Sequence, residues 1–397
     1  MRQPVPATED FFDQDAIGVL YNNSLMVMNR IRESAINQET GKKLGPLFQI
    51  SKAAQLVGRT ASAIREAEKD GRLPARERNA SGRRLQYTLE DLDIMRQVFG
   101  TRPWRSPDDP AAIISISNFK GGVGKSTTAI HLAQYLAIQG YRVCLIDCDS
   151  QATTTMMFGY VPDVDLGERD TLYGYIHDMP PGGLRSFVRK THFYNLDLVP
   201  ANLKLYNLEY EIAGYIMQNQ SFDVIDSIAR AVETIESDYD VIILDPPPAL
   251  GMISLGVLTA ANALIIPMPP SIIDFSSTAS FLDMLNSTMK QMEMSYRKRP
   301  IYNFVKIVGS KADEGKSMHR EILGMTSKLF GRYMLNSVLR NSAEIDNASS
   351  RMKTVYELER PVTSHEVHGR CITSLNAVNF EIEQEILKTW SGRASNF

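Results

Sequence analysis

The sequence predicts an α/β protein whose largest part is a doubly wound, mostly parallel β-sheet covered by helices on both faces. Three observations support this fold. Short runs rich in Val and Ile alternate with helical segments after residue 104. Many of these runs are apolar on both faces, as in a sheet with two covered sides. A glycine-rich loop follows the first run and precedes a helical pattern. The expected strands are 113–117, 142–147, 196–200, 240–244, 263–267, 303–308 and 334–339.

Length and composition limit the possible classes of protein. The 397 residues are enough for two or more domains, and 43% hydrophobic with 22% charged residues is typical of a globular protein. The formal net charge is −3, so any nucleic-acid surface has to be local. Cys144, Cys148 and Cys371 lack zinc-ligand spacing and indicate reduced thiols. No apolar run reaches the ~20 residues that span a bilayer, so we expect a cytoplasmic protein without a membrane partner.

Residues 1–46 are expected to contain one long amphipathic helix. Its apolar seam recurs at spacings of four and three, at Ile17, Tyr21, Ser24, Met28, Ile31 and Ala35. The turn-rich segment 40–46 ends it. Such a seam packs either on the rest of the chain or on a second copy, and periodicity does not distinguish the two. Dimerisation is the interpretation that we favour.

Residues 47–104 have the sequence pattern of a helix-turn-helix. A short helix begins at Ser51, Gly58 makes the turn, and Thr60 caps a second helix. A basic, hairpin-like stretch follows, with a turn at 79–82, and then a closing helix at 89–99. Between residues 52 and 84, nine basic residues stand against four acidic ones. This local excess is the electrostatic footprint of a DNA-binding module.

The segment 50–74 resembles the winged helix-turn-helix of MerR-like regulators and of large plasmid ParA proteins. The resemblance implies that the second helix enters the major groove, and that the wing contacts the DNA backbone or the minor groove. The implied DNA-binding residues are Thr60, Ser62 and Arg65 of the helix and Arg83 and Arg84 of the wing. A small helical packing domain with a solvated basic face is the alternative.

The third region, 105–397, follows a linker with prolines at 103, 107 and 110 and opens with the glycine-rich loop. The loop is Lys120-Gly121-Gly122-Val123-Gly124-Lys125-Ser126-Thr127. Its glycines let the backbone fold around an anion at the positive end of a helix. Lys125 is expected to reach the β- and γ-phosphates, and the Ser126 hydroxyl to bind Mg²⁺. The sequence therefore predicts a nucleotide-binding P-loop formed by residues 121–127.

This loop also matches, without a mismatch, the KGGVGK[ST]T pattern of the deviant Walker A ATPases, the ParA/MinD group. In that family the early lysine, here Lys120, reaches across a dimer interface to the partner's nucleotide. The resemblance implies a homodimer that encloses ATP and Mg²⁺ and leaves ADP after hydrolysis. A solvated loop charge is the alternative for Lys120.

Two carboxylates, Asp147 and Asp149, stand at the end of the second expected strand. There they would face the γ-phosphate region. The segment resembles the family's D-x-D-P-Q switch, which implies that Asp149 positions or activates the hydrolytic water and that Asp147 supports the metal. Ser150 and Ala152 replace the usual Pro and Gly. An aspartate pair at a strand end is otherwise a helix cap or a solvated loop.

A third carboxylate, Asp245, follows the apolar strand 240–244 and precedes three prolines. A strand that delivers an aspartate at its end is the Walker B arrangement, in which the carboxylate holds Mg²⁺ directly or through water. The segment resembles the family's D-x-P-P switch. Pro246 stands where relatives often have a hydroxyl residue.

Over residues 47–390 the chain resembles the large ParA proteins of low-copy plasmids, and RepA of repABC-type replicons most closely. The resemblance implies a slow, partner-stimulated ATPase that binds DNA non-specifically as an ATP dimer and associates with the nucleoid. It also implies plasmid segregation with a ParB-type centromere-binding protein, RepB in that system. Repression of its own operon through operator DNA is the second implied activity.

Three other classes of protein were compared. The nitrogenase iron-protein branch needs cluster-ligating cysteines, but none lies between Cys148 and Cys371. A MinD-like protein would end in a basic amphipathic helix, whereas 380–390 is acidic. A repressor that uses nucleotide only as a switch remains an alternative. Non-specific DNA binding needs cations outside the basic module, and Arg340, Arg351 and Lys353 are the candidates, with a solvated basic face equally open.

Overall fold

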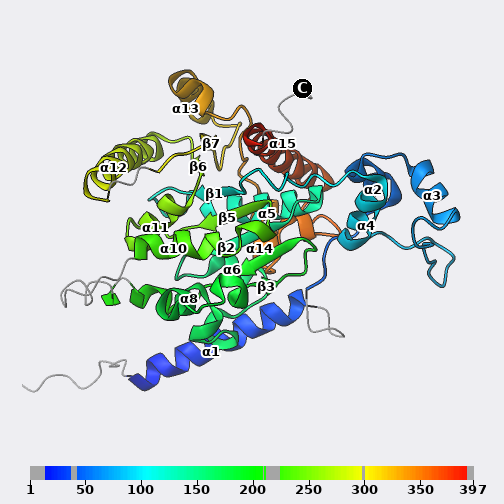
Figure 1. Ribbon diagram of the computed structural model, residues 1–397, viewed down its shortest axis with the longest axis horizontal. Helices are drawn as coiled ribbons and strands as arrows, with labels where there is room; N and C mark the ends of the chain where they lie inside the picture. The colour runs from blue at the N-terminus through cyan, green and yellow to red at the C-terminus, as the bar shows by residue number, and fades with distance from the viewer. Residues whose placement is uncertain (1–13, 37–42, 209, 212–223, 297–299, 391–397) are drawn as a thin grey trace, which may run out of the picture.

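The computed structural model describes residues 14–36, 43–208, 210–211, 224–296 and 300–390 (Figure 1). Seven strands form its sheet: β1 (Ala112–Ile116), β2 (Val143–Asp147), β3 (Arg189–Lys190), β4 (Leu196–Val199), β5 (Val241–Asp245), β6 (Ala263–Met268) and β7 (Phe304–Gly309). The α-helices are α1 (Gln14–Ala35), α2 (Ile50–Val57), α3 (Ala61–Lys69), α4 (Leu89–Phe99), α5 (Lys125–Gln139), α6 (Thr153–Met157), α7 (Pro162–Asp165), α8 (Leu172–Asp178), α10 (Val224–Glu233), α11 (Met252–Ala260), α12 (Ile272–Tyr296), α13 (Ser317–Phe330), α14 (Ala343–Ser349) and α15 (His365–Thr389). Short 3₁₀ turns are η1 (Glu168–Asp170), η2 (Gly183–Phe187), η3 (Glu236–Asp238), η4 (Gly331–Tyr333) and η5 (Val355–Glu357).

The strands run in the order β3-β4-β2-β5-β1-β6-β7, and every neighbouring pair is parallel except β3 with β4. Successive side chains of each strand enter opposite cores, because strand side chains alternate. In β5, Val241 and Ile243 pack with α5 and α15, whereas Ile242 and Leu244 pack with α8, α10, α11 and α12. Both faces are therefore covered, and the predicted doubly wound sheet is confirmed.

Six of the seven expected strands are present, but the strand expected at 334–339 is wrong. Only isolated bridges form there, Met334 with Ile307 and Arg340 with Ala312. Helix α15 supplies the missing hydrogen-bond partners. The Glu381 carboxylate accepts from the backbone N–H groups of Asn336 and Ser337, and the Ser374 hydroxyl donates to the Val338 carbonyl. Backbone groups satisfied by side chains in this way need no strand partner.

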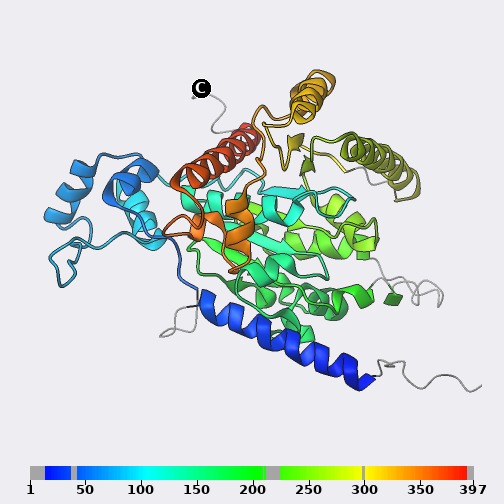
Figure 2. The same ribbon diagram turned by 180° about the vertical axis from the view of Figure 1, so that it is seen from behind.

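The single long helix expected in the N-terminal region is present as α1, which lies along the lower edge of the molecule in Figures 1 and 2. Its C-terminal end is attached to the body, since Ala35 is buried and Arg32 pairs with Asp165 at 2.6 Å. The other end of its seam is uncovered, with Ile17 and Tyr21 59% and 56% exposed. The structure thus leaves an apolar surface on α1. Among the described residues, no helix is both long and apolar enough to cross a bilayer.

In the second region, α2 and α3 lie where the sequence pattern predicts them. Gly58 ends α2 in the left-handed conformation, with φ 69°, and the Thr60 hydroxyl caps α3 by accepting from the Ala63 N–H. A bridge between Arg78 and Arg84 closes the hairpin-like stretch. The apolar side chains of α2, α3 and α4 belong to the same core as those of α5 and α15. The module therefore packs directly on one side of the sheet domain.

Arg96 of α4 is the main polar anchor of this packing. Its guanidinium is buried and donates to the Leu56 carbonyl and to the Ile138 carbonyl near the end of α5. Burial lowers the pKa of Arg96 to about 10. Gly140 lets the guanidinium approach, because a Cβ there would lie 2.7 Å from it.

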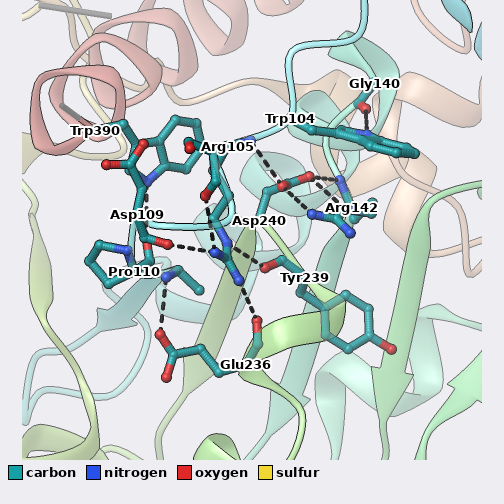
Figure 3. Close-up of polar contacts among 12 residues, drawn as sticks. Trp104, Arg105, Asp109, Pro110, Gly140, Arg142, Glu236, Tyr239, Asp240 and Trp390 are labelled. Carbon is teal, nitrogen blue, oxygen red and sulfur yellow. Dashed lines mark hydrogen bonds and ion pairs between the residues drawn. The ribbon is translucent and has the colours of Figure 1, made fainter. Parts of the chain in front are cut away.

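The segment that connects the module to β1 is also fixed in place (Figure 3). The Arg105 guanidinium donates to the carbonyls of Asp109, Glu236 and Tyr239. Its backbone N–H donates to the buried Asp240 carboxylate, which also pairs with Arg142 at 2.7 Å. At either end, the indoles of Trp104 and Trp390 donate to the carbonyls of Gly140 and Pro110. This connecting segment, residues 104–110, is therefore packed against the sheet domain, and we call it the strap.

Candidate functional site

The glycine-rich loop connects β1 to α5 at the carboxyl edge of the sheet. Gly122 and Gly124 have φ of 74° and 96°, values that L side chains rarely adopt, so both positions require glycine. The loop is anchored from the end of the edge strand β7, because the Ser310 hydroxyl after β7 donates to the Val123 carbonyl at 2.8 Å. Residues 121–124 thus form the predicted loop, and Lys125, Ser126 and Thr127 form the first turn of α5.

Lys125 places a buried positive charge beneath this loop. Its side chain is 7% exposed, and its ammonium donates to the Lys120 carbonyl at 3.2 Å. Burial lowers the pKa of Lys125, and the carboxylates of Asp245 and Asp149 oppose that shift. No carboxylate of the described residues lies within ion-pair distance of its ammonium. An anion held by the loop would supply the missing charge.

Asp147 and Asp245 lie side by side as register partners of β2 and β5. Both are buried, and burial together with the neighbouring carboxylate raises the pKa of Asp147. Burial likewise raises the pKa of Asp245, whereas hydrogen bonds from Thr154 and Ser126 lower it. Asp245 Oδ1 is buried without a hydrogen-bond partner among the described residues. Two adjacent carboxylates with an open oxygen are suited to a divalent cation.

Thr154 and Thr155 contact the carboxylates of the site, and the sequence analysis did not identify them. The Thr154 hydroxyl donates to Asp245 at 2.7 Å, and the Thr155 hydroxyl and N–H donate to Asp147 at 2.7 and 2.8 Å. Both belong to α6. A run of three threonines after the aspartates was the only available signal. The structure shows that the first turn of α6 orients both carboxylates.

Asp149 lies at the rim of the site, and its carboxylate is not fully buried. Its N–H donates to Asp147 Oδ1 and its own Oδ1 accepts from the Gln151 N–H, so the turn is ordered by the two aspartates. Ala152 has φ 51°, the left-handed conformation that glycine adopts without strain. The alanine that replaces the family's usual glycine therefore keeps the glycine conformation.

Lys120 is held within its own chain. Its ammonium lies 2.5 Å from a carboxylate oxygen of Asp274, in the first turn of α12. Asp274 is in turn fixed by the Ser271 hydroxyl at 2.5 Å. Within this chain Lys120 is therefore paired, while its side chain stays 34% exposed. Asp274 is a third residue that the sequence analysis missed, since it belongs to no motif.

The expected DNA-binding residues of the module are far from the nucleotide loop. Ser62 and Arg65 are exposed on α3, at the outer end of the module (Figures 1 and 2), and Thr60 is occupied as its cap. Arg83 is exposed on the hairpin, whereas Arg84 forms an ion pair with Glu68 and donates to the Tyr87 hydroxyl. Arg84 thus fastens the hairpin to α3.

The three cations outside the module differ in their surroundings. Arg340 pairs with Glu314 at 2.8 Å. Arg351 is exposed and Lys353 is half-buried. Between the last two, Met352 has a left-handed backbone with φ 51°. Arg351 and Lys353 are therefore on one strained turn, apart from Arg340.

Comparison with known proteins agrees with this geometry. A family model described as an AAA domain matches residues 111–298. The chain is 33% identical over 357 residues to a putative replication protein A of Rhizobium rhizogenes, which covers 86% of this chain and 87% of the relative. It is 34% identical over 322 residues to protein SopA of Escherichia coli K12, covering 80% and 82%.

Solved structures share the fold. A structure described as a partition protein matches with a TM-score of 0.66 and 17% identity, covering 93% of this chain and 98% of that one. A complex of a McdA variant from Cyanothece with ATP matches with a TM-score of 0.54 and 20% identity, covering 68% and 97%.

Proposed function

Because the chain belongs to the ParA-type plasmid partition ATPases, the family of SopA and of the repABC replication protein A, we propose that it segregates plasmid copies as an ATP-dependent dimer. In this proposal ATP and Mg²⁺ bind at the glycine-rich loop, and the ATP state binds DNA non-specifically. A ParB-type, RepB-like protein stimulates slow hydrolysis, and operator DNA binds the helix-turn-helix module. The protein would then be cytoplasmic and associated with the nucleoid.

One observation carries the nucleotide assignment. The buried Lys125 ammonium, at the start of α5, lies close enough to Asp245 for that carboxylate to raise the pKa of the lysine, so the site has both a cation for phosphate and a carboxylate with an open oxygen for Mg²⁺. Mg²⁺ usually takes one or two carboxylates and completes its shell with phosphates and water. These residues fit a magnesium nucleotide.

Each side chain then has a defined task. Lys125 and the N–H groups of 121–127 would hold the phosphates, while Ser126, Asp245 and Asp147 would hold the metal and its waters. Asp149, at the exposed rim, would orient the attacking water. When bound, Mg²⁺ would neutralise the phosphate charge. Positioning and charge account for most catalysis of phosphoryl transfer, so a partner that improves the position of the water would accelerate a slow basal turnover.

Two features support a dimer. The exposed seam of α1 offers an apolar surface to a second copy. Lys120 stands at the rim of the site, one third exposed, where a partner's nucleotide could reach it. We propose that α1 contributes to dimerisation and that Lys120 leaves Asp274 for the partner's ATP.

Two groups of cations support DNA binding. Ser62, Arg65 and Arg83 form the exposed face of the helix-turn-helix module, proposed for the operator. Arg340, Arg351 and Lys353 are proposed for non-specific DNA, although Arg340 would first have to leave Glu314. Phosphate contacts of this kind are independent of sequence and depend on salt.

Binding of the full-length protein to random DNA and to DNA from its own promoter, with ATP, ADP or no nucleotide, tests the proposal. Random-DNA binding that requires ATP supports partition. Promoter binding favoured by ADP supports the second, regulatory activity. The alternative is a nucleotide-switched repressor, which the direct packing of the module on the sheet domain favours. That alternative gains if ATP turnover stays unchanged with DNA and the ParB-type partner.

A further inference from the structure

Lys43 is a buried lysine outside both the nucleotide site and the proposed DNA surfaces. Its side chain is 3% exposed, and its ammonium contacts three acceptors: Glu357 Oε1 at 2.6 Å, the Met157 carbonyl at 2.7 Å and the Met352 carbonyl at 2.7 Å. An ammonium has three donors, so all of them are used. A buried charge is tolerated only when it is paired and hydrogen-bonded in this way. Lys43 thus connects two segments that are distant from it and from each other in the sequence, α6 and the stretch 352–357.

The first of these segments is α6. Met157 is its last residue, and the first turn of the same five-residue helix carries Thr154 and Thr155. These threonines hold Asp245 and Asp147, the proposed metal carboxylates. Helix α6 therefore has the metal site at one end and Lys43 at the other. Packed elements move as units, so a shift of the carboxylates reaches the Met157 carbonyl.

The second segment is the turn around Met352. Its left-handed backbone is uncommon for a residue other than glycine, so surrounding contacts have to hold it. The hydrogen bond from Lys43 to the Met352 carbonyl is one such contact. Arg351 and Lys353, two cations proposed for non-specific DNA, flank it directly. Their presentation therefore depends on a bond that Lys43 donates.

Glu357 closes the arrangement from the same stretch of chain. Its Oε2 accepts from the Thr354 N–H at 2.6 Å, and its Oε1 also contacts His192 Nε2 at 2.6 Å. The lysine stem fits closely as well, since a Cβ at Gly159 would lie 3.2 Å from it. Lys43 consequently has little room to move unless α6 or the 352–357 stretch moves with it.

We propose that Lys43 couples the nucleotide site to the basic turn 351–353 through α6, so that the ATP and ADP states present Arg351 and Lys353 differently to DNA. This inference rests on the proposed function. A ligand changes a distant site only if the connecting element has a different arrangement in each state, and the α6–Lys43–Met352 path is a physical candidate for that element.

Hydrogen exchange of the wild-type protein tests the path without a mutation. With a non-hydrolysable ATP analogue and Mg²⁺ in place of ADP and Mg²⁺, amide exchange should change in peptides covering 153–159 and also in those covering 350–357. A change confined to 153–159 would overturn the proposal. So would identical exchange of 350–357 in both nucleotide states.

DNA affinity of the variant K43M/E357Q tests the consequence. Both charges of the pair are removed together, so neither stays buried alone, and the glutamine amide oxygen introduced by E357Q can still accept from the Thr354 N–H. The matched control is K190M, which removes an 86% exposed lysine from its pair with Asp197. The ratio of random-DNA dissociation constants in ADP and in ATP should fall at least about fivefold in K43M/E357Q and stay unchanged in K190M.

The results of the DNA-binding experiment distinguish the coupling through Lys43 from the proposed partition function. If wild type prefers DNA with ATP and K43M/E357Q keeps the full preference, the coupling through Lys43 is wrong and the proposed function stands. If wild type shows no nucleotide preference, both are wrong. Fluorescent ATP binding and circular dichroism show whether the variant is folded, and if it is not, the wild-type exchange experiment decides.

Discussion

Lys120 and Asp274 form an ion pair within one chain, with the ammonium 2.5 Å from the carboxylate. The lysine is one third exposed and the aspartate is largely buried, and the pair joins the start of the glycine-rich loop to the start of α12. The same lysine is proposed to contact the partner's nucleotide. The two interactions exclude each other, so in this proposal Asp274 would compete with dimer formation.

Substitution D274N should therefore favour the ATP dimer. Without the carboxylate, Lys120 is free for the partner's phosphates, and a partly exposed ion pair contributes about 1 kcal/mol. The ATP concentration at half-maximal dimerisation should fall up to about fivefold, as measured by sedimentation. D283N, on an exposed part of the same helix, serves as the control. An unchanged or higher midpoint in D274N would show that the pair does not compete.

The two lysines of the loop should have separable roles. K125M removes the buried cation that is proposed to bind the phosphates, so nucleotide affinity should fall about a hundredfold or more. K120M should bind fluorescent ATP nearly as well as wild type but fail to dimerise. Titration of both variants, followed by light scattering with ATP, distinguishes them. Equal loss of nucleotide affinity in K120M would place Lys120 in its own chain's site.

The nucleotide-free protein should become less stable as the pH rises. Burial and Asp245 raise the pKa of Asp147 above its unfolded value, so the native state binds more protons than the unfolded state and stability falls as pH rises through the native pKa. D147N removes this dependence, so its melting temperature relative to wild type should be at least about 2 °C higher at pH 8 than at pH 6. Equal gains at both pH values would contradict the argument. Mg²⁺ with ATP should reduce the pH dependence in wild type.

Arg96 should be important for the attachment of the helix-turn-helix module. R96A leaves the Leu56 and Ile138 carbonyls without their donor and opens a cavity, so the free energy of unfolding should fall by about 2–4 kcal/mol. Urea denaturation measures this change. R72A is the control, because Arg72 is 52% exposed and pairs only with Asp70, and it should change stability by about 0.5 kcal/mol or less.

Arg351 should contribute to sequence-independent DNA binding. R351A removes one exposed cation, so affinity for random DNA should fall and the slope of log K against log salt should decrease by about 1. K388A, on the exposed side of α15, should leave the slope unchanged. A wild-type slope in R351A would remove Arg351 from the DNA surface.

Local patterns were sufficient to predict the loop and six strands of the sheet, but not the two-residue edge strand β3. β5 is apolar at every position before Asp245 because both of its faces are covered, and the two left-handed glycines follow from the loop sequence. Contacts between segments that are distant in the sequence leave no recognisable pattern in the sequence. The strand expected at 334–339 fails because Glu381 and Ser374 of α15 take its hydrogen bonds, and no periodicity reveals that.

The same limit applies to the site. Asp147 and Asp245 could be identified because they end strands, but Asp274 and Thr154 depend on how α12 and α6 dock. Lys43 is an ordinary lysine in a turn-rich segment until the fold places it against Glu357. Charges that are paired across the tertiary structure look the same in the sequence as solvated ones.

The fixed position of the module on the sheet domain has a consequence for the spacing of the DNA half-sites that a dimer would bind. Since Arg96 and the shared apolar core hold the module against the sheet domain, the distance between the two α3 helices of the proposed dimer would be set by the way the two sheet domains meet. Operator half-sites repeat at about 34 Å, one turn of the double helix. If α3 binds operator DNA as proposed, an operator with that spacing would accept one dimer geometry and reject others, so operator affinity would depend on the nucleotide state.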